Sequence, residues 1–397
     1  GADGVPLRDA IMWQDTRNGD VCEARKDRDD RVRALCGAGI NTVFSGGKMA
    51  WLREEEPDIY ERAQKLAVIP DLLIREMTGA LVTDHTYGSR SLLMDIRARQ
   101  WSPELLELFG VTEDKLCALI PPSSAAGYIT EDFAERTGLP ADIQVITCGG
   151  DQQCAALGLG VTGPGKAAVN LGTGAYLIAA ADAVPEELPR GLICSASAIP
   201  GQVILEASVL TCGAAVDWFL QDQDYSPVGR ALRESPAGAR GVLVLPHFQG
   251  RSAPDWNSAA RAGFFGLSLE TGRLDLLRAL LEGIAIEVSG SLEQIEICRS
   301  VDTVCLSGGL SRTAEVCQLF ADVTGKKVLY AEDDEATTRG AWMSAAHWAG
   351  LVRDWETAWE TACPREFTVY TPNRDLTEFY KHQSARLETL YKATRGL

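Results

Sequence analysis

The sequence predicts an α/β fold with two domains, and three observations support this prediction. The chain has 397 residues, which is too many for a single hydrophobic core. Short apolar runs typical of strands alternate along the chain with longer stretches that have helical periodicity. Hydrophobic residues make up 46% and charged residues 23% of the chain, which is the balance of an ordinary globular protein.

The first part of the chain is expected to contain more helix than strand. Strands are expected at 9–14 and 143–147, and helices at 20–36, 47–66 and 102–109. The third of these helices begins with Ser102, Pro103 and Glu104, a combination that favours a helix start. Residues 68–78 fit either a short strand or a helix ahead of the break at Gly79.

The second part of the chain has clearer strand patterns. Residues 166–171 and 175–181 are expected to form a hairpin, and residues 274–296 a long helix with apolar side chains at three- and four-residue steps. Further strands are expected at 203–207, 241–246 and 301–306, and a further helix at 313–324. The last residues, 351–397, are expected to form a helical, charged tail.

Composition excludes several classes of function. The net charge of −17, from 38 basic and 55 acidic residues, disfavours nucleic-acid binding, which needs clustered Lys and Arg. No apolar stretch reaches the roughly 18 residues expected of a membrane span. The eleven cysteines are dispersed, which is typical of reduced thiols in the cytoplasm. The four histidines are far apart and lack the spacing of a zinc site.

Asp151 is the first candidate for chemistry. It follows an apolar strand and the pair Gly149 and Gly150, and a run of small residues typical of a helix comes after it. The glycines allow a sharp turn, and a carboxylate at a helix N-terminus is stabilised by the helix dipole. Such a carboxylate is suited to act as a general base if it faces a cleft. An ordinary helix-capping Asp gives the same local pattern.

Two further glycine turns follow predicted strands and are candidates for phosphate binding. Gly172, Thr173 and Gly174 leave backbone N–H groups free to approach phosphate oxygens, although a tight hairpin turn has the same sequence. Gly308 and Gly309 lie between a strand and a helix, where nucleotides often bind, although a plain connecting loop also fits. The phosphate-binding motif Gly-x₄-Gly-Lys-Ser/Thr is absent.

The order and spacing of these motifs resemble the FGGY carbohydrate kinases, which include glycerol kinase, xylulokinase, gluconokinase and fuculokinase. Residues 11–17 resemble the family's Trp-x-Asp-x-Arg segment, and Thr83, Asp84, Ser89 and Arg90 its next conserved stretch. Residues 150–153 resemble its catalytic motif, 172–174 its phosphate-binding hairpin, 263–282 its signature, and 308–341 its adenosine-binding region.

The resemblance implies two actin-like, ribonuclease-H-like domains with a cleft between them. It implies domain limits of 1–148 for a sugar-binding domain and 149–350 for an ATP-binding domain, followed by the tail at 351–397. It also implies ATP-dependent phosphorylation of a hydroxyl of a sugar or polyol, with ATP and Mg²⁺ as cofactors. In-line phosphoryl transfer of this kind depends mostly on positioning and electrostatics.

The resemblance also implies roles for individual residues. Asp151 is expected to be the base and to contact the metal. The backbone of Gly172, Thr173 and Gly174 is expected to hold phosphate oxygens, and Gly308 and Gly309 to lie against the adenosine. Thr313, with Arg312, occupies the place where the family often has an Asn that bonds adenine.

Five residues are expected to contact the sugar, and two of them bear on its identity. They are Trp13, Asp15, Val43, Gln152 and Leu210. Val43 and Leu210 stand where glycerol-specific members of the family have aromatic side chains. The aliphatic side chains widen the pocket, which favours a ketose such as xylulose, or a sugar-derived polyol. A glycerol kinase and a catalytically silent nucleotide-binding relative are the alternatives.

Two expectations concern the rest of the molecule. The family begins with an Asp-x-Gly-Thr-type phosphate loop, and this chain has none. The first domain is therefore expected to be truncated at its N-terminus, and the chain to be inactive until native upstream residues are restored. The expected partner is a small sugar or polyol, without nucleic acid or membrane, and a homodimer is possible by analogy with relatives.

Overall fold

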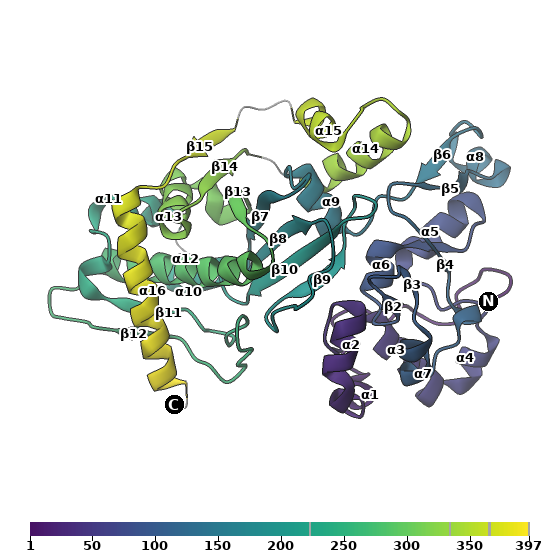
Figure 1. The fold of residues 1–397 in the computed structure, drawn as a ribbon, viewed down its shortest axis with the longest axis horizontal. Coiled ribbons are helices and arrows are strands. Elements are labelled where there is room, and N and C mark those ends of the chain that lie inside the picture. The colour runs from purple at the N-terminus through teal and green to yellow at the C-terminus, as the bar shows by residue number, and fades with distance from the viewer. Residues whose placement is uncertain (222–223, 333–334, 364–366, 396–397) are drawn as a thin grey trace.

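A computed structural model describes residues 1–221, 224–332, 335–363 and 367–395, which form two lobes (Figure 1). The lobe that contains the N-terminus consists of short helices and three two-stranded sheets, whereas the other lobe is built on a seven-stranded sheet. The α/β class expected from the sequence is therefore confirmed. Within these residues, no helix combines the length and apolarity that are needed to cross a membrane.

The seven-stranded sheet has the order β15-β14-β13-β7-β8-β10-β9. Its strands are β7 (Gly165–Leu171), β8 (Ala175–Ala181), β9 (Ile193–Ala196), β10 (Val203–Val209), β13 (Val301–Ser307), β14 (Lys327–Tyr330) and β15 (Thr368–Tyr370). Strand β13 runs parallel to β7, and Ser307 pairs with Asn170. Both strands end within two residues of this pair, so the glycine turns that follow them lie at the same edge of the sheet.

The two faces of this sheet bury different side chains because successive strand residues point to opposite sides. Ala167, Val169 and Leu171 pack into a large core with α12 (Arg273–Cys298) and α13 (Ala314–Thr324). Ala168 lies on the other face, in a smaller core with Ala156 of α9 (Asp151–Gly158). The sheet therefore fixes the helix that begins with the candidate base.

The remaining elements of the second lobe surround this sheet. They are α10 (Gly213–Leu220), α11 (Ser226–Glu234), β11 (Leu243–Leu245), β12 (Gly263–Phe265), α14 (Ala336–Trp348), α15 (Trp355–Ala362), α16 (Arg374–Thr394) and the 3₁₀ turns Ala239–Gly241 and Gly309–Arg312. The segment after residue 350, expected to be a helical tail, contributes β15 to the sheet as well as two helices.

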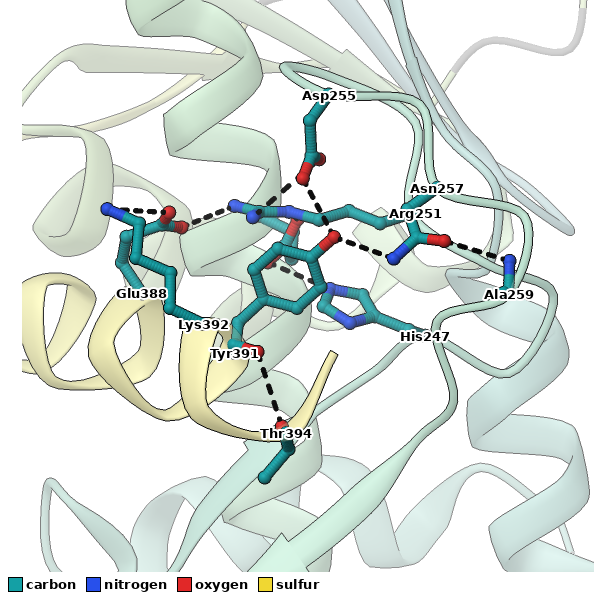
Figure 2. Close-up of polar contacts among 10 residues, drawn as sticks. His247, Arg251, Asp255, Asn257, Ala259, Glu388, Tyr391, Lys392 and Thr394 are labelled. Carbon is teal, nitrogen blue, oxygen red and sulfur yellow. Dashed lines mark hydrogen bonds and ion pairs between the residues drawn. The ribbon is translucent and has the colours of Figure 1, made fainter. Parts of the chain in front are cut away.

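Helix α16 is attached to the second lobe by a partly buried polar cluster (Figure 2). The Arg251 guanidinium lies 4.2 Å from the centre of the Tyr391 ring and donates to Glu388 at 2.8 Å. The Tyr391 hydroxyl donates to Asp255 at 2.8 Å and accepts from Asn257 at 3.1 Å. These contacts join the end of the chain to the loop between β11 and β12.

The first lobe packs its helices around Val32, Phe44 and Phe109, which are almost fully buried. Its helices are α1 (Gly19–Glu23), α2 (Asp29–Cys36), α3 (Ser45–Glu55), α4 (Pro57–Arg62), α5 (Ile69–Thr78), α6 (His85–Ser89), α7 (Pro103–Phe109) and α8 (Glu131–Thr137), with 3₁₀ turns at Lys26–Arg28 and Glu113–Lys115. Its strands pair as β1 (Val82–Asp84) with β4 (Ala118–Ile120), β2 (Met94–Asp95) with β3 (Gln100–Trp101), and β5 (Ala125–Tyr128) with β6 (Gln144–Ile146).

The prediction of a strand at 9–14 is wrong, because the described structure has no strand there. Its apolar side chains are not buried in a sheet: Met12 is 62% exposed and Trp13 is 61% exposed. Residues 68–78, which fit either element, form the helix α5, with Pro70 in its first turn.

Glycines allow α9 and α14 to pack with their backbones in contact. A Cβ atom on Gly340 would lie 1.9 Å from the Cys154 carbonyl oxygen, and one on Gly158 would lie 1.9 Å from the Ala336 carbonyl oxygen. We expect Gly340→Ala to lower the free energy of unfolding by about 1–3 kcal/mol, because the helices must separate. Urea denaturation measures this loss.

The matched control for this prediction is Gly290→Ala in α12. A Cβ atom there would meet no other atom within 4 Å. The substitution should raise the free energy of unfolding by up to about 1 kcal/mol, because alanine loses less backbone freedom than glycine on folding. Equal effects of the two substitutions would contradict the proposed close contact between α9 and α14.

Candidate active site

Asp151 is the first residue of α9, at the end of the turn that follows β6. Gly149 has a φ of +100°, which favours glycine, and Gly150 is the N-cap residue of the helix. The Asp151 carboxylate accepts one hydrogen bond, from the Gln152 N–H at 2.8 Å, and the residue is exposed. Because Gly150 holds the cap position, Asp151 is not an ordinary capping residue, and its carboxylate is accessible to a reactant.

The hairpin turn between β7 and β8 is attached to the N-terminus of α10 through its carbonyl groups. The Gly172 carbonyl accepts from the Gly213 N–H at 2.8 Å, and the Thr173 carbonyl accepts from the Cys212 N–H at 2.8 Å. In a trans peptide the C=O and the following N–H point in opposite directions. The N–H groups of Thr173 and Gly174 therefore point away from α10, in an orientation suited to bind an anion.

The third glycine turn packs against the base of this hairpin. A Cβ atom on Gly308 would lie 2.5 Å from the Asn170 side-chain oxygen and 2.6 Å from the Leu171 carbonyl oxygen. Gly308 also has a φ of +93°. Gly309 differs, because a Cβ atom there would meet no atom within 4 Å. Gly308 thus joins the two turns, and Gly309 faces open space that a ligand can occupy.

Thr313 is the N-cap residue of α13, and its carbonyl accepts from the Val316 N–H at 2.9 Å. It follows the turn of Gly309–Arg312, so it lies within four residues of the open position at Gly309. Its side chain makes no capping hydrogen bond to the helix that it begins. The hydroxyl is therefore not committed to the N-terminus of α13.

The expected sugar-binding residues of the first lobe lie in the segment before α1 and in the turn before α3. Trp13 is 61% exposed, so it is not a core tryptophan and is available to contact a ligand. Val43 is 40% exposed. Asp15 forms an ion pair with Arg17 at 2.7 Å, and hydrogen bonds from Arg17 lower the pKa of the Asp15 carboxyl to about 2.

The two remaining expected sugar contacts lie beside the glycine turns. Gln152 is exposed and follows Asp151 directly. Leu210 lies beside the hairpin, because a Cβ atom on Gly174 would be 3.2 Å from the Leu210 carbonyl oxygen. Among the described residues, no hydrogen bond or ion pair connects Asp151 with Trp13, Asp15 or Val43. The structure thus joins the expected phosphate, adenosine and Leu210 positions.

An ion pair between the lobes was not identified from the sequence. Arg90, the residue directly after α6, pairs with Glu206 of β10, and Glu206 also accepts from the Ser195 hydroxyl at 2.5 Å. Glu206 is only 7% exposed. The signal in the sequence is a single carboxylate within the apolar strand Val203–Val209, since buried charges require a partner.

A metal ion would have to rely on few protein ligands. Within the described ranges, no group of three or more His, Cys, Asp or Glu side chains is arranged to hold one. Mg²⁺ is commonly bound by one or two carboxylates together with phosphate oxygens and water. The exposed Asp151 carboxylate, which accepts only one hydrogen bond, fits this type of site.

Comparison with known proteins identifies related families and folds. Residues 2–158 match the N-terminal domain, and residues 167–349 the C-terminal domain, of the FGGY family of carbohydrate kinases. The chain is 31% identical to a glycerol kinase of Ectopseudomonas mendocina, covering 89% of this chain and 74% of that protein. It is 25% identical to a xylulose kinase of Staphylococcus xylosus, covering 96% of this chain and 81% of that protein. Its fold matches the crystal structure of gluconate kinase from Lactobacillus acidophilus with a TM-score of 0.91. The two are 22% identical in sequence, and the match covers 100% of this chain and 81% of that protein.

Proposed function

The chain belongs to the FGGY family of carbohydrate kinases, and we propose that it phosphorylates a ketose such as xylulose, or a related sugar-derived polyol. Members of this family are ATP-dependent phosphotransferases that act on sugars or polyols. The choice of substrate within this class, and the residue roles below, are our proposals. The observation that carries the catalytic role is the exposed Asp151 carboxylate at the start of α9, one residue after the cap.

In the proposed reaction, Asp151 accepts the proton of the substrate hydroxyl as its oxygen attacks the terminal phosphorus of ATP. The N–H groups of Thr173 and Gly174 bind phosphate oxygens, and Gly309 leaves room for the adenosine. Mg²⁺ neutralises phosphate charge when bound, and the free oxygen of Asp151 is suited to hold it. Trp13 packs against sugar carbons, and Asp15 and Gln152 bind sugar hydroxyls.

The residue types at two of the expected sugar contacts favour a substrate larger than glycerol. Val43 and Leu210 are aliphatic at the two positions where the resemblance leads us to expect aromatic side chains in a glycerol-specific enzyme. Each missing contact should change substrate preference by about 1–3 kcal/mol. Glycerol kinase is the second candidate, because a relative that is 31% identical has that name.

We expect the full-length protein to release ADP faster with xylulose, ribulose, fuculose or gluconate than with glycerol. The measurement is kcat/KM for ADP release on each of the five compounds. The double variant Val43→Tyr with Leu210→Phe should shift preference toward glycerol by about 10-fold or more, because two aromatic rings narrow the pocket. Ile69→Tyr is the control, since Ile69 is 56% exposed on α5.

Three results would decide against this proposal in different ways. A clear preference of the natural protein for glycerol would favour the glycerol kinase alternative. A double variant with unchanged substrate preference would show that Val43 and Leu210 do not contact the sugar. Absence of ADP release with every compound, although ATP binds, would favour a catalytically silent relative.

The eleven cysteines are all free thiols in the structure. Free thiols persist in reducing compartments, which supports a cytoplasmic location as part of the proposal. We also propose a homodimer, by analogy with relatives alone.

A further inference from the structure

We infer that Asp84 and Thr86, from the first lobe, are positioning residues that fix the backbone in front of Asp151. This inference rests on the proposed role of Asp151 as the base. Neither residue touches the proposed reactants. Both act through the turn of Gly149 and Gly150, whose direction determines where the Asp151 side chain points.

The connection is a short chain of buried hydrogen bonds. Asp84 is the N-cap residue of α6, and its carboxylate accepts from the Thr86 N–H at 2.8 Å and from the Thr86 hydroxyl at 2.5 Å. The Thr86 hydroxyl in turn accepts from the Gly150 N–H at 3.0 Å. Asp84 is 3% exposed and Thr86 is 1% exposed. Because the hydroxyl donates its only proton to Asp84, its lone pairs are directed to the Gly150 N–H.

The methyl group of Thr86 also contacts this turn. A Cβ atom on Gly149 would lie 3.0 Å from the Thr86 methyl carbon, so the glycine and the threonine fit closely. Burial raises the pKa of the Asp84 carboxyl, and the hydrogen bonds from the Thr86 hydroxyl and N–H oppose this rise. The turn before Asp151 therefore meets Thr86 at both its hydroxyl and its methyl group.

Helix α6 is itself attached to the second lobe, so Asp84 and Thr86 are held in place relative to the turn of Gly149 and Gly150. The Ser89 hydroxyl accepts from the Ala196 N–H of β9 at 3.1 Å, and Arg90 pairs with Glu206 of β10. Figure 1 shows α6 on the side of the first lobe that faces these strands. Losing the Thr86 hydroxyl would leave the Gly150 N–H buried without a partner, which costs free energy and favours reorientation of the peptide.

The experiment compares Thr86→Val, which removes the hydroxyl but keeps the shape, with Thr86→Ser, which keeps the hydroxyl. Thr130→Val is the matched control, because the Thr130 hydroxyl accepts from the Phe133 N–H at the start of α8, in the same lobe. Four quantities are measured in the full-length protein: kcat, KM for the sugar, ATP affinity by calorimetry, and hydrogen exchange of the Gly150 amide.

We expect Thr86→Val to lower kcat by about 10-fold to 100-fold, with KM for the sugar and ATP affinity changed by less than about threefold. Misplacement of a catalytic group affects the transition state more than ground-state binding. The Gly150 amide should lose protection from exchange. Thr86→Ser should keep this protection and most of kcat, and Thr130→Val should leave both unchanged. If T86V does not fold, T86A is measured instead, with the same expected losses.

Failure of this inference is distinguishable from failure of the proposed function. A T86V protein with normal kcat, beside an inactive Asp151→Asn protein, would overturn the positioning inference alone. Equal losses of kcat in T86V and T86S would also overturn it, because the hydroxyl would then not be the cause. An Asp151→Asn protein with normal kcat would contradict the assignment of Asp151 as the base, and the positioning inference would then fail as well.

Discussion

An Asp151→Asn protein is expected to turn over substrate at least about 100-fold more slowly than the natural protein while it still binds ATP. The amide has the shape of the carboxylate but cannot accept the proton of the attacking hydroxyl. The substitution should not disturb the fold, because Asp151 is exposed and an amide oxygen can accept from the Gln152 N–H as the carboxylate does. The measurements are kcat for ADP release and ATP affinity by calorimetry.

Asp142→Asn is the control for charge. Asp142 is exposed and lies just before β6, so the substitution removes the same charge upstream of the same turn. It should leave kcat unchanged. A normal kcat for Asp151→Asn would contradict the assignment of the base, and a parallel loss of ATP binding would instead indicate that Asp151 acts mainly on the nucleotide or its metal.

The elements that the sequence predicted well are those whose pattern depends on local burial. The hairpin expected at 166–171 and 175–181 is observed as β7 (Gly165–Leu171) and β8 (Ala175–Ala181), because most residues of both strands are buried on both faces and form apolar runs. The helix expected at 274–296 is α12 (Arg273–Cys298), whose apolar positions follow the helical period.

Elements and contacts that depend on distant residues were missed. Strand β15 has two exposed residues among its three, and it is a strand because it pairs with β14. The apolar residues at 9–14 have the composition of a strand, but the described structure gives them no strand to pair with. A strand needs a neighbour, and the sequence of one segment does not identify it.

The candidate site shows the same division. Asp151 and the glycine turns were recognised because each motif is contiguous and lies at the end of a strand. Thr86 was not, because its hydroxyl meets the Gly150 N–H across 64 residues of sequence, and nothing near Thr86 marks that contact. Arg90 was recognised only as part of a motif, since its partner Glu206 lies in the other lobe.

The open space at Gly309 leads to the prediction with the most specific effect on nucleotide binding. A valine side chain at this position would enter the space that we assign to the adenosine, because a Cβ atom there meets no protein atom within 4 Å. Gly309 also has no positive φ, so valine introduces no backbone strain of the kind expected at Gly308. The substitution should therefore affect the ligand and not the fold.

We expect Gly309→Val to weaken ATP binding by about 100-fold or more, roughly 3 kcal/mol, while the melting temperature is kept. Gly308→Ala should instead lower the melting temperature, because its Cβ atom would lie 2.5 Å from the Asn170 side-chain oxygen and its φ is +93°. Gly163→Val is the control, since a Cβ atom on Gly163 also meets nothing within 4 Å, and neither property should change. Calorimetry and thermal unfolding distinguish the three variants. Unchanged ATP affinity in the folded Gly309→Val protein would place the adenosine elsewhere, because an occupied site cannot accommodate both the ring system and the valine.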